Sequence, residues 1–344
     1  MIWLTWRQFR LQALVVLGVV AALAVLLALT GPGLLDDYQA DKINFLDRVD
    51  LDKINFFLYA AGLALLYAAP PVIGAFWGAP LIARELEAGT HRLVWTQSIS
   101  RSRWLAVKLG LTGLTAVVIT GLLSLAVTWW SSPFDQAANA SDGSGNYLPR
   151  LLPPVFGARG VVPIGYAAFA FALGVAIGLV VRRSVVAIAI TLTAVIAVQV
   201  VMPLTLRPQL ITPAETTVTL TPDTLRGLML SGPEANPDVV LLEAKFEGAG
   251  GWKLSDRTID ASGQIAATIP PWVADCGPAR PGVEAAQTSE ACFKRLADEG
   301  YKQLITYQPA SRFWGLQWRE AGIFFALALA LTGFCFWRIR RDLS

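Results

Sequence analysis

The chain has 344 residues, of which 54% are hydrophobic and 15% are charged, and its formal net charge is +3. Soluble globular proteins usually carry about 25% charged residues, so this composition excludes an ordinary soluble domain and indicates a membrane protein. The small net charge, with no basic face on an independent fold, argues against nucleic-acid binding.

The chain begins with a short segment that combines aromatic and basic side chains. A helix over residues 1–10 would place three apolar side chains on one face and two basic ones on the other: Ile2, Trp6 and Phe9 against Arg7 and Arg10. A helix of this kind lies flat in the head-group layer of a membrane. The sequence therefore predicts an amphipathic interfacial helix over 1–10, with a simple positive flank of the first span as the alternative.

Residues 11–29 form an apolar run in which Gln12 is the one polar side chain. At 1.5 Å per residue, a helix of this length crosses the roughly 30 Å of hydrocarbon in a bilayer. A cleaved signal peptide is the alternative, but its apolar core would be about 7–15 residues long, and an Ala-x-Ala site would follow it. We interpret the run as a retained first span. The acidic segment 31–52 is expected outside, and 34–61, which lacks Pro and Gly, is expected to be an amphipathic helix leading to the second span.

The second span, about 57–82, is interrupted by Pro70, Pro71 and Gly74. Proline removes backbone hydrogen bonds and kinks helices, which a membrane tolerates only where neighbours or water satisfy the freed carbonyl groups. The span is therefore either a bent packing helix or a helix that lines a pathway or a moving interface.

A charged bridge over residues 83–104 joins the second span to the third, which is expected over about 105–128. Two spans this close form a hairpin, so the bridge is a turn on one side of the membrane. Five cations stand in this bridge or directly after it: Arg84, Arg92, Arg101, Arg103 and Lys108. Short loops rich in Lys and Arg stay in the cytoplasm, so this side is predicted to be cytoplasmic.

Three further spans complete the inventory. The fourth is expected over 161–181, the fifth over 184–202 and the sixth over 321–337, each with arginines at its inner end. Residues 131–160, between the third and fourth spans, are expected to be a loop. Gln199 stands near the end of the fifth span, where a lone Gln more often makes a helix–helix hydrogen bond than a ligand contact.

The fold class that follows is an all-α polytopic membrane protein with six transmembrane helices and both termini in the cytoplasm. A small α+β extracytoplasmic domain is predicted between the fifth and sixth helices. The chain is expected to divide into an interfacial helix, five spans with the loop 83–104, the outer domain, and the sixth span with a basic tail: 1–10, 11–203, 204–318 and 319–344.

The outer domain is expected to contain three strands and a helix that ends at Gly300: 217–220, 239–246, 301–307 and 284–299. Two of the three cysteines, Cys276 and Cys292, fall in this domain, where the compartment is oxidising, so they are predicted to form a disulfide. Such a bond would stabilise the fold by about 3 kcal/mol, and two free thiols are the alternative. Cys335, in the sixth span, is expected to be a buried packing residue.

The sequence offers no catalytic or metal-binding constellation. His91 is the only histidine, so neither a metal site nor a catalytic triad can be built on it. No Asp or Glu falls inside the expected spans, with Glu320 at the outer boundary of the last, which argues against a pump driven by protons or sodium. No Gly-x-x-x-x-Gly-Lys-[Ser/Thr] loop is present, so any energy from ATP must enter through a partner.

The charged bridge resembles the first cytoplasmic loop of ABC-transporter permeases of the ABC type-2, or type V, exporter group. The residues that carry the resemblance are Glu85, Gly89-Thr90, Ser100-Arg101 and Lys108. The six-span layout, the amphipathic N-terminal helix and the inner C-terminus extend it over most of the chain, which is most similar to actinobacterial permeases of the group. The full domain at 204–318 departs from this pattern, because such permeases often have a shorter re-entrant element there.

The resemblance implies that the bridge is a coupling helix resting in a groove of a separate ABC ATPase. The residues carried over for this role are Arg84, Glu85, Leu86, Glu87, Gly89, Thr90, His91 and Arg92, with Gly89 ending the helix. Two ATPase subunits, which hold ATP and Mg²⁺, would then rock two permease copies, expected to be a homodimer. The family places the second and fifth spans at the dimer interface and along the route, which here assigns Pro70, Pro71, Gly74 and Gln199. The alternative for the bridge is a charged loop that only sets the topology.

The leading hypothesis is therefore the permease subunit of an ATP-driven exporter in a bacterial plasma membrane, itself neither an enzyme nor a holder of cofactors. Its cargo is expected to be a hydrophobic or amphipathic compound such as a drug, antibiotic or lipid, because the spans offer little charge for a polar solute. The alternative function is a membrane sensor or scaffold that transports nothing and binds a ligand through its outer domain.

Overall fold

The structure is a computed structural model that describes residues 2–50, 53–89, 100–140, 147–231, 238–266, 269–270, 272–273 and 285–341. The chain forms two compact units. The helical unit consists of residues 1–211 and 312–344, and the α+β unit consists of residues 212–311.

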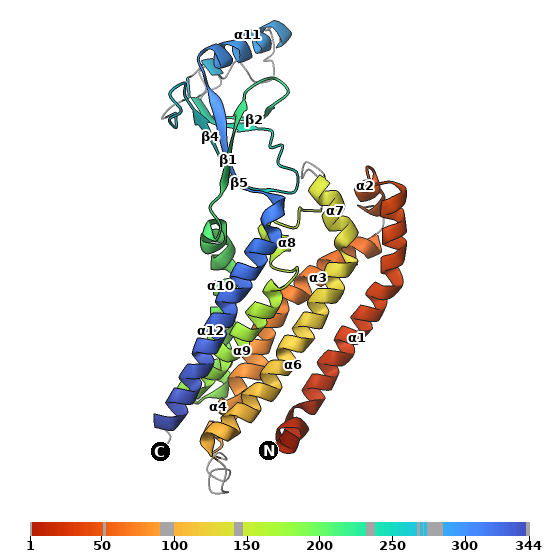
Figure 1. The fold of residues 1–344 in the computed structure, drawn as a ribbon, viewed down its shortest axis with the longest axis vertical. Helices are drawn as coiled ribbons and strands as arrows, with labels where there is room; N and C mark the ends of the chain where they lie inside the picture. The colour runs from red at the N-terminus through yellow and green to blue at the C-terminus, as the bar shows by residue number, and fades with distance from the viewer. Residues whose placement is uncertain are drawn as a thin grey trace. The chain divides into compact units, whose positions relative to one another are not determined.

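Six helical segments of the helical unit are long and apolar enough to cross a membrane, as the sequence predicts. They are α1 (Ile2–Ala40), the continuous rod α3–η1–α4 (Lys53–Val72, Ile73–Gly78 and Ala79–Glu87), α6 (Arg101–Trp130), α9 (Val162–Val181), α10 (Ser184–Val201) with its extension through η2 (Met202–Leu206) and η3 (Arg207–Gln209), and α12 (Phe313–Arg341). The start of α1 and the end of α12 lie at the same end of the bundle, here called the terminal end (Figure 1).

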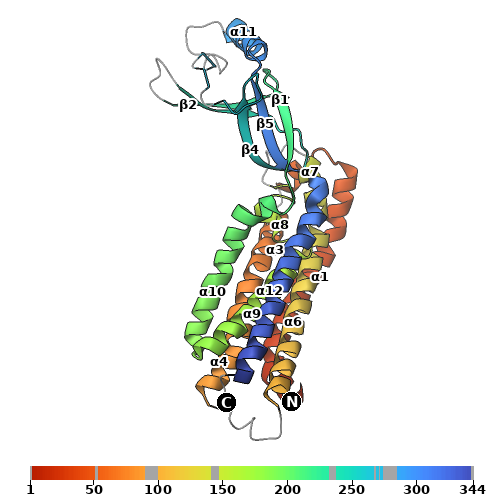
Figure 2. The same cartoon turned by 60° about the vertical axis from the view of Figure 1, so that its left-hand side comes forward.

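Helix α9 is the centre of the helical unit. Its apolar window is 67% buried, far more than that of any other of the six spans, because the rod α3–η1–α4, α6, α10 and α12 all pack against it. In Figure 2, α10 lies on one side of α9, and α6 and α1 lie on the other side. A helix that is apolar on every face is buried on every face, and small residues along α9 let its neighbours approach closely.

Two helices begin earlier than the expected spans. Residues 2–10 are the first turns of the continuous helix α1, so their position in the head-group layer stays a prediction. Helix α12 begins at Phe313 and not at residue 321, so Glu320 lies inside the helix and is fully buried. The statement that no acid falls within a span was therefore wrong for Glu320.

The segments at the opposite end of the bundle are more ordered than the sequence indicates. Helix α1 stops at Ala40 because the Asp41 side chain accepts a hydrogen bond from the backbone N–H of Asn44 at 3.1 Å and begins a turn, so no single helix runs over 34–61. The short helices here are α2 (Phe45–Asp50), α7 (Ser132–Ala140) and α8 (Pro153–Phe156). The last two lie in the expected loop. Aromatic packing around the fully buried Phe134 holds α7, and the ring of Phe156 in α8 packs against Phe313 of α12.

The α+β unit contains an antiparallel sheet in the order β1–β5–β4 and a separate β2–β3 ladder. Its elements are β1 (Ala214–Thr219), β2 (Leu225–Ser231), β3 (Asp238–Ala244), β4 (Trp252–Ile259), α11 (Ala285–Asp298) and β5 (Lys302–Gln308). In the register of β1 and β5, Thr216 lies opposite Ile305, which is fully buried with Phe293 and Leu296 of α11.

The three strands and the helix expected in this unit are confirmed as β1, β3, β5 and α11, whereas β2 and β4 were not predicted. The chain leaves α11 through Gly300, whose φ of 77° favours glycine. Cys276 lies outside the described residues, so the Cys276–Cys292 disulfide stays a prediction. Cys335 is a buried free thiol of α12, as expected.

Candidate coupling segment and buried polar sites

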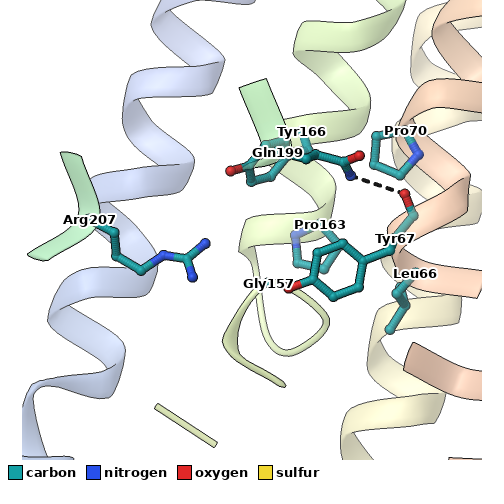
Figure 3. A pocket seen from close by; sticks show the side chains of 8 residues that line it. All are labelled: Leu66, Tyr67, Pro70, Gly157, Pro163, Tyr166, Gln199 and Arg207. Carbon is teal, nitrogen blue, oxygen red and sulfur yellow. Dashed lines mark hydrogen bonds between the residues drawn. The ribbon is translucent and has the colours of Figure 1, made fainter. Parts of the chain in front are cut away.

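Pro71 changes the backbone hydrogen bonding of the second span. Proline has no N–H, so the carbonyl of Tyr67, four residues earlier, loses the donor that a regular helix would supply. The side-chain amide of Gln199 on α10 takes that place and donates to the Tyr67 carbonyl at 3.0 Å (Figure 3). The expectation that Gln199 makes a helix–helix hydrogen bond is confirmed, and the structure brings two features together that the sequence presents separately.

Pro70 and Gln199 also line one pocket. Its eight lining residues come from the second, fourth and fifth spans and the turns beside them: Leu66, Tyr67, Pro70, Gly157, Pro163, Tyr166, Gln199 and Arg207. The side chains close this pocket so tightly that no water molecule fits in it. It is therefore a closed contact between spans in this conformation.

Gly74, predicted at the pathway or dimer interface, contacts α9 of its own chain. A Cβ at Gly74 would lie 2.7 Å from the carbonyl oxygen of Ala170, and one at Gly78 would lie 2.5 Å from that of Phe171. From the other side, a Cβ at Gly174 would collide with the backbone of Gly74. Small residues four positions apart on both helices thus let the two backbones touch, a packing mode common between membrane helices.

The π-helical segment η1 begins at Ile73, two residues after Pro71, and continues into α4. π-Helical turns are rare and occur often at functional sites, where an extra residue alters the direction of a helix. The rod therefore changes its helical geometry at the level where it packs most closely on α9.

A second polar cluster joins the end of α10 to α12. The guanidinium of Arg207 forms two hydrogen bonds with Glu320, from Nε at 2.7 Å and from Nη2 at 2.8 Å, and the Tyr166 hydroxyl donates to the same carboxylate at 3.0 Å. Arg207 and Glu320 are both almost completely buried. The ring of Phe156 lies 4.4 Å from the guanidinium carbon. The charge of Glu320 is therefore compensated, so the spans still offer no uncompensated acid there.

Sequence reasoning missed this ion pair. Glu320 was placed at the boundary of the last span, and Arg207 was placed at the start of the outer domain. The two residues are far apart in the chain, and only the packing of α12 beside α10 and α9 brings them together. The one available signal was that a Glu directly next to an apolar run needs a partner if it is buried.

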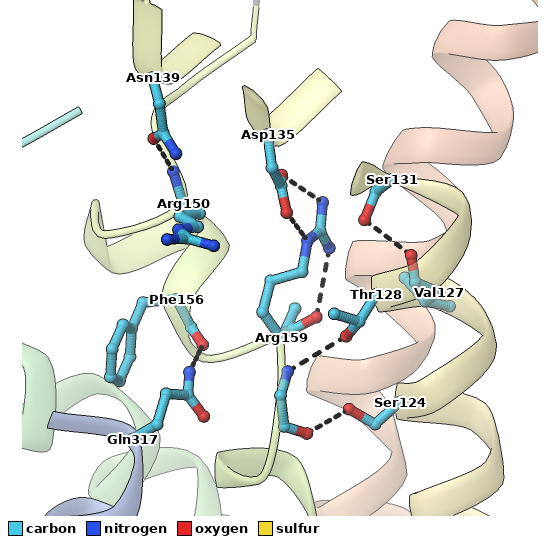
Figure 4. A network of polar contacts seen from close by, with 12 residues as sticks. Ser124, Val127, Thr128, Ser131, Asp135, Asn139, Arg150, Phe156, Arg159 and Gln317 are labelled. Carbon is cyan, nitrogen blue, oxygen red and sulfur yellow. Dashed lines mark hydrogen bonds and ion pairs between the residues drawn. The ribbon is translucent and has the colours of Figure 1, made fainter. Parts of the chain in front are cut away.

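A third cluster holds the turn between α8 and α9 (Figure 4). Arg159 forms a bidentate ion pair with Asp135 of α7, at 2.9 and 3.3 Å. Burial raises the pKa of the Asp135 carboxyl, and the charge of Arg159 opposes that shift. On the same turn, Ser124 of α6 donates to the carbonyl of Gly160 at 2.6 Å. The pair therefore ties α7 to the turn that precedes α9.

Gln317 fastens the start of α9 to α12. Its side-chain oxygen accepts hydrogen bonds from the N–H groups of Val161 and Val162, both at 3.0 Å, and its amide donates to the carbonyl of Phe156 at 3.0 Å. The first N–H groups of a helix have no partner within the helix, so a buried start needs such an acceptor. This fully buried Gln was also not predicted.

At the terminal end, α4 leads into the predicted coupling segment. Helix α4 ends at Glu87, and Gly89 follows with a φ of 70°, the conformation expected of a glycine that ends a helix. Arg84 is exposed, and Leu86 packs partly against the core. Thr90, His91 and Arg92 lie outside the described residues.

The two acidic residues of this last turn contact different helices. Glu85 forms an ion pair with Lys108 of α6, which is buried and lies 5.0 Å from the ring of Trp104. Glu87 accepts hydrogen bonds from the backbone N–H and the hydroxyl of Ser184, at 3.0 and 2.8 Å. Ser184 is the first residue of α10, so the carboxylate lies where the helix dipole favours a negative charge.

Among the described residues, no group of three His, Cys, Asp or Glu side chains could hold a metal ion. The sequence profile of the ABC-2 membrane transporter related family matches residues 17–207, more than half of the chain. The chain belongs to this family.

Membership identifies the chain as an ABC-2 type permease, a multi-pass membrane component of a transport system, in bacteria at the plasma membrane. Permeases of this kind are not themselves catalytic and associate with an ABC ATPase. No curated protein and no solved structure matches the chain. The matched range ends at Arg207, and α12 lies outside it. The ion pair between Arg207 and Glu320 therefore connects the region that matches the family to α12.

Proposed function

We propose that this permease forms the membrane pathway of an ATP-driven type V exporter. Two copies work with two ABC ATPase subunits, which bind ATP and Mg²⁺, and the segment 83–104 rests on an ATPase as the coupling element. The terminal end faces the cytoplasm. The orientation is supported by arginines at this end of four helices: Arg84, Arg101 and Arg103, Arg182 and Arg183, and Arg338, Arg340 and Arg341.

The observation that carries the proposal is the double attachment of the last turn of α4. Glu85 holds this turn to α6 through Lys108, and Glu87 holds it to α10 through Ser184. A push on the segment 83–104 therefore acts on three spans at once, because charge-assisted hydrogen bonds fix the geometry of the turn relative to both neighbours.

The rod α3–η1–α4 carries the movement from the coupling segment toward the middle of the membrane. It has no break between Lys53 and Glu87, and its contacts with α9 are backbone to backbone at Gly74 and Gly78. Close packing of this kind transmits displacement because it has no flexible side chains to absorb it. The bend at Pro71 and the hydrogen bond from Gln199 lie at the far end of this path, where the second and fifth spans would separate from or approach a second copy.

The cargo in this proposal is hydrophobic or amphipathic. The buried charges of Arg207 and Glu320 compensate one another in a bidentate ion pair, so neither is left to attract a polar solute. A polar solute would need side chains that hydrogen-bond to it along the way, whereas an apolar one needs only space and packing.

The test is a charge reversal in the coupling turn. The permease and its ATPase are reconstituted in proteoliposomes, and ATP hydrolysis and transport of the amphipathic dye Hoechst 33342 and of a fluorescent NBD-phospholipid are measured together. Glu85→Lys places a cation against Lys108 and is expected to abolish ATP-dependent transport while hydrolysis continues. Unchanged transport of a probe that the wild type carries would refute the coupling role.

The exchange variant Glu85→Lys with Lys108→Glu is the matched control. It restores an ion pair between positions 85 and 108 with the two charges exchanged. Position 85 still carries a positive charge in place of the negative one that the ATPase would meet. Recovery of transport assigns Glu85 to the contact within the permease, whereas persistent uncoupling in a correctly folded exchange variant assigns it to the contact with the ATPase. Failure of the permease to co-purify with any ATPase would favour the sensor or scaffold alternative.

A further inference from the structure

A groove of about 610 Å³ lies between α6, α9 and α12 and belongs to none of the sites above. Its lining is apolar except for Thr332: Ala106, Leu109, Gly110, Gly113, Val117, Ala168, Phe171, Ala172, Phe325, Ala328, Leu329, Thr332 and Phe336. The volume is within the range of sites that hold a small molecule, roughly 300–1,000 Å³. Several lining residues, among them Gly110 and Leu329, are exposed, so the groove opens sideways from the bundle.

The groove exists because three helices close together in one half of the bundle and separate in the other. Toward the opposite end, a Cβ at Gly165 of α9 would lie 3.0 Å from the Cα of Ala321 of α12, and Ser124 of α6 donates to the carbonyl of Gly160 at 2.6 Å. Toward the terminal end, a Cβ at Gly110 of α6 would meet no atom within 4 Å. Small side chains such as Gly110 and Ala172 thus help to leave a channel over α9 in this half.

The groove has the length of one membrane leaflet. On α6 it extends from Ala106 to Val117, and on α12 from Phe325 to Phe336. At 1.5 Å per residue each stretch is about 16 Å long. Half of a hydrocarbon core of about 30 Å is about 15 Å, so an extended acyl chain of the leaflet at the terminal end fits the groove from end to end. A transmembrane helix of another chain would instead cover both leaflets.

One arginine on each helix lies a turn beyond the groove lining at the terminal end. Arg103 is three residues before Ala106 on α6, and Arg340 is four residues after Phe336 on α12, so each lies on the face of its helix that lines the groove. The two helix ends meet there, since Nε of Arg340 donates to the hydroxyl of Ser102 at 3.4 Å. Lipid phosphates lie at this depth, and each Lys or Arg near an anionic membrane surface strengthens binding to it.

We propose that this groove binds one acyl chain of a phospholipid with an anionic head group, whose phosphate lies among the arginines at the ends of α6 and α12. The length and the apolar lining of the groove favour an acyl chain, and the positive charge at its mouth favours an anionic head group. The lipid fills space that α9 would otherwise expose, so it acts as a bound component of the helical unit. Lipid binding in this groove does not depend on the proposed export function. Only the assignment of the leaflet at the terminal end to the cytoplasmic side rests on the proposed function.

The test is photo-crosslinking of the full-length permease in nanodiscs of phosphatidylcholine. A trace of phosphatidylglycerol with a diazirine on one acyl chain is added, and the labelled peptides are mapped by mass spectrometry. Labelling is expected on the groove faces of α6 and α12, above the level of α1. A phosphatidylcholine carrying the same diazirine is expected to label less. Equal labelling of all lipid-facing helices by both probes would overturn the proposal.

Two variants and a control sharpen the result. Gly110→Leu adds a bulky side chain at the groove, at a position where a Cβ would meet no atom within 4 Å, so labelling of α12 is expected to fall to the level of α1, whereas Gly18→Leu, at an equally open position on α1, leaves it unchanged. Arg103→Ala is expected to lower phosphatidylglycerol labelling about fivefold, the factor for one basic residue at an anionic surface. Disulfide formation between two copies carrying Ala106→Cys, with no lipid label, would assign the groove to a second copy and overturn the proposal. None of these measurements needs the ATPase or transport.

Discussion

Breaking the ion pair between Arg207 and Glu320 is expected to destabilise the helical unit strongly. Both side chains are buried, and the hydrogen bonds at 2.7 and 2.8 Å leave the carboxylate with one further described contact, the hydroxyl of Tyr166. Removing one partner of a buried pair typically costs about 3–5 kcal/mol, because the remaining charge is left without compensation. We expect Glu320→Leu to reach or exceed this range, since a guanidinium cannot lose its proton.

The opposite truncation is expected to cost less. In Arg207→Met the carboxyl of Glu320 can take up a proton, and the neutral acid keeps its hydrogen bond with Tyr166. The double variant Arg207→Met with Glu320→Leu leaves no charge to compensate, and replacing a buried pair by packed apolar side chains is often neutral or stabilising. The expected order of stability is therefore wild type and double variant first, then Arg207→Met, then Glu320→Leu.

The assay is thermal unfolding of the purified permease in detergent, followed by tryptophan fluorescence. At about 2–4 °C per kcal/mol for a domain of this size, a loss of about 3–5 kcal/mol lowers Tm by roughly 6 to 20 °C. A double variant that loses the sum of the two single losses, and so melts below both single variants, would refute the reasoning, because the two side chains would then contribute independently and not as a pair.

Two further predictions concern the packing of the second span. Gln199→Leu is expected to destabilise the wild type by about 0.6–1.7 kcal/mol. In a Pro71→Ala background it is expected to have almost no effect, because the alanine restores the backbone N–H that proline lacks. Equal losses of stability in both backgrounds, measured by the same unfolding assay, would contradict the role assigned to the Gln199 amide. Gly174→Val is expected to prevent close packing against Gly74 and to abolish the folded monomer peak in size-exclusion chromatography, while Gly333→Val, in open space on α12, leaves the peak intact. A normal elution profile for the Gly174 variant would show that the two helices are free to separate.

The extent to which the sequence predicts this fold depends on the range of the interaction. The six spans follow from apolar runs of sufficient length, and the end of α4 follows from Gly89, since both are properties of neighbouring residues. Helix α7 was missed because its residues are polar and small, and it is held by the packing of Phe134 and by the pair of Asp135 with Arg159, which no local pattern shows.

In the candidate sites, too, the sequence indicates which residues are unusual, and the tertiary structure determines their contacts. The sequence marked Pro71 and Gln199 as unusual within apolar spans, and it marked Glu85 and Glu87 as part of a charged turn. The family resemblance assigned the two acids to contacts with an ATPase, which stays a prediction. The structure adds their contacts with Lys108 and Ser184 of their own chain, which no local pattern shows.

The sequence by itself determined that this chain crosses a membrane, where it crosses and which turn carries its charge, because hydrocarbon thickness and the cost of burying charge act on consecutive residues. Tertiary structure alone decided which polar groups pair: Gln199 with the carbonyl that Pro71 frees, and Arg207 with Glu320. In a medium without water each buried polar group must find a protein partner, and which partner it reaches depends on how the helices pack and not on their order in the chain.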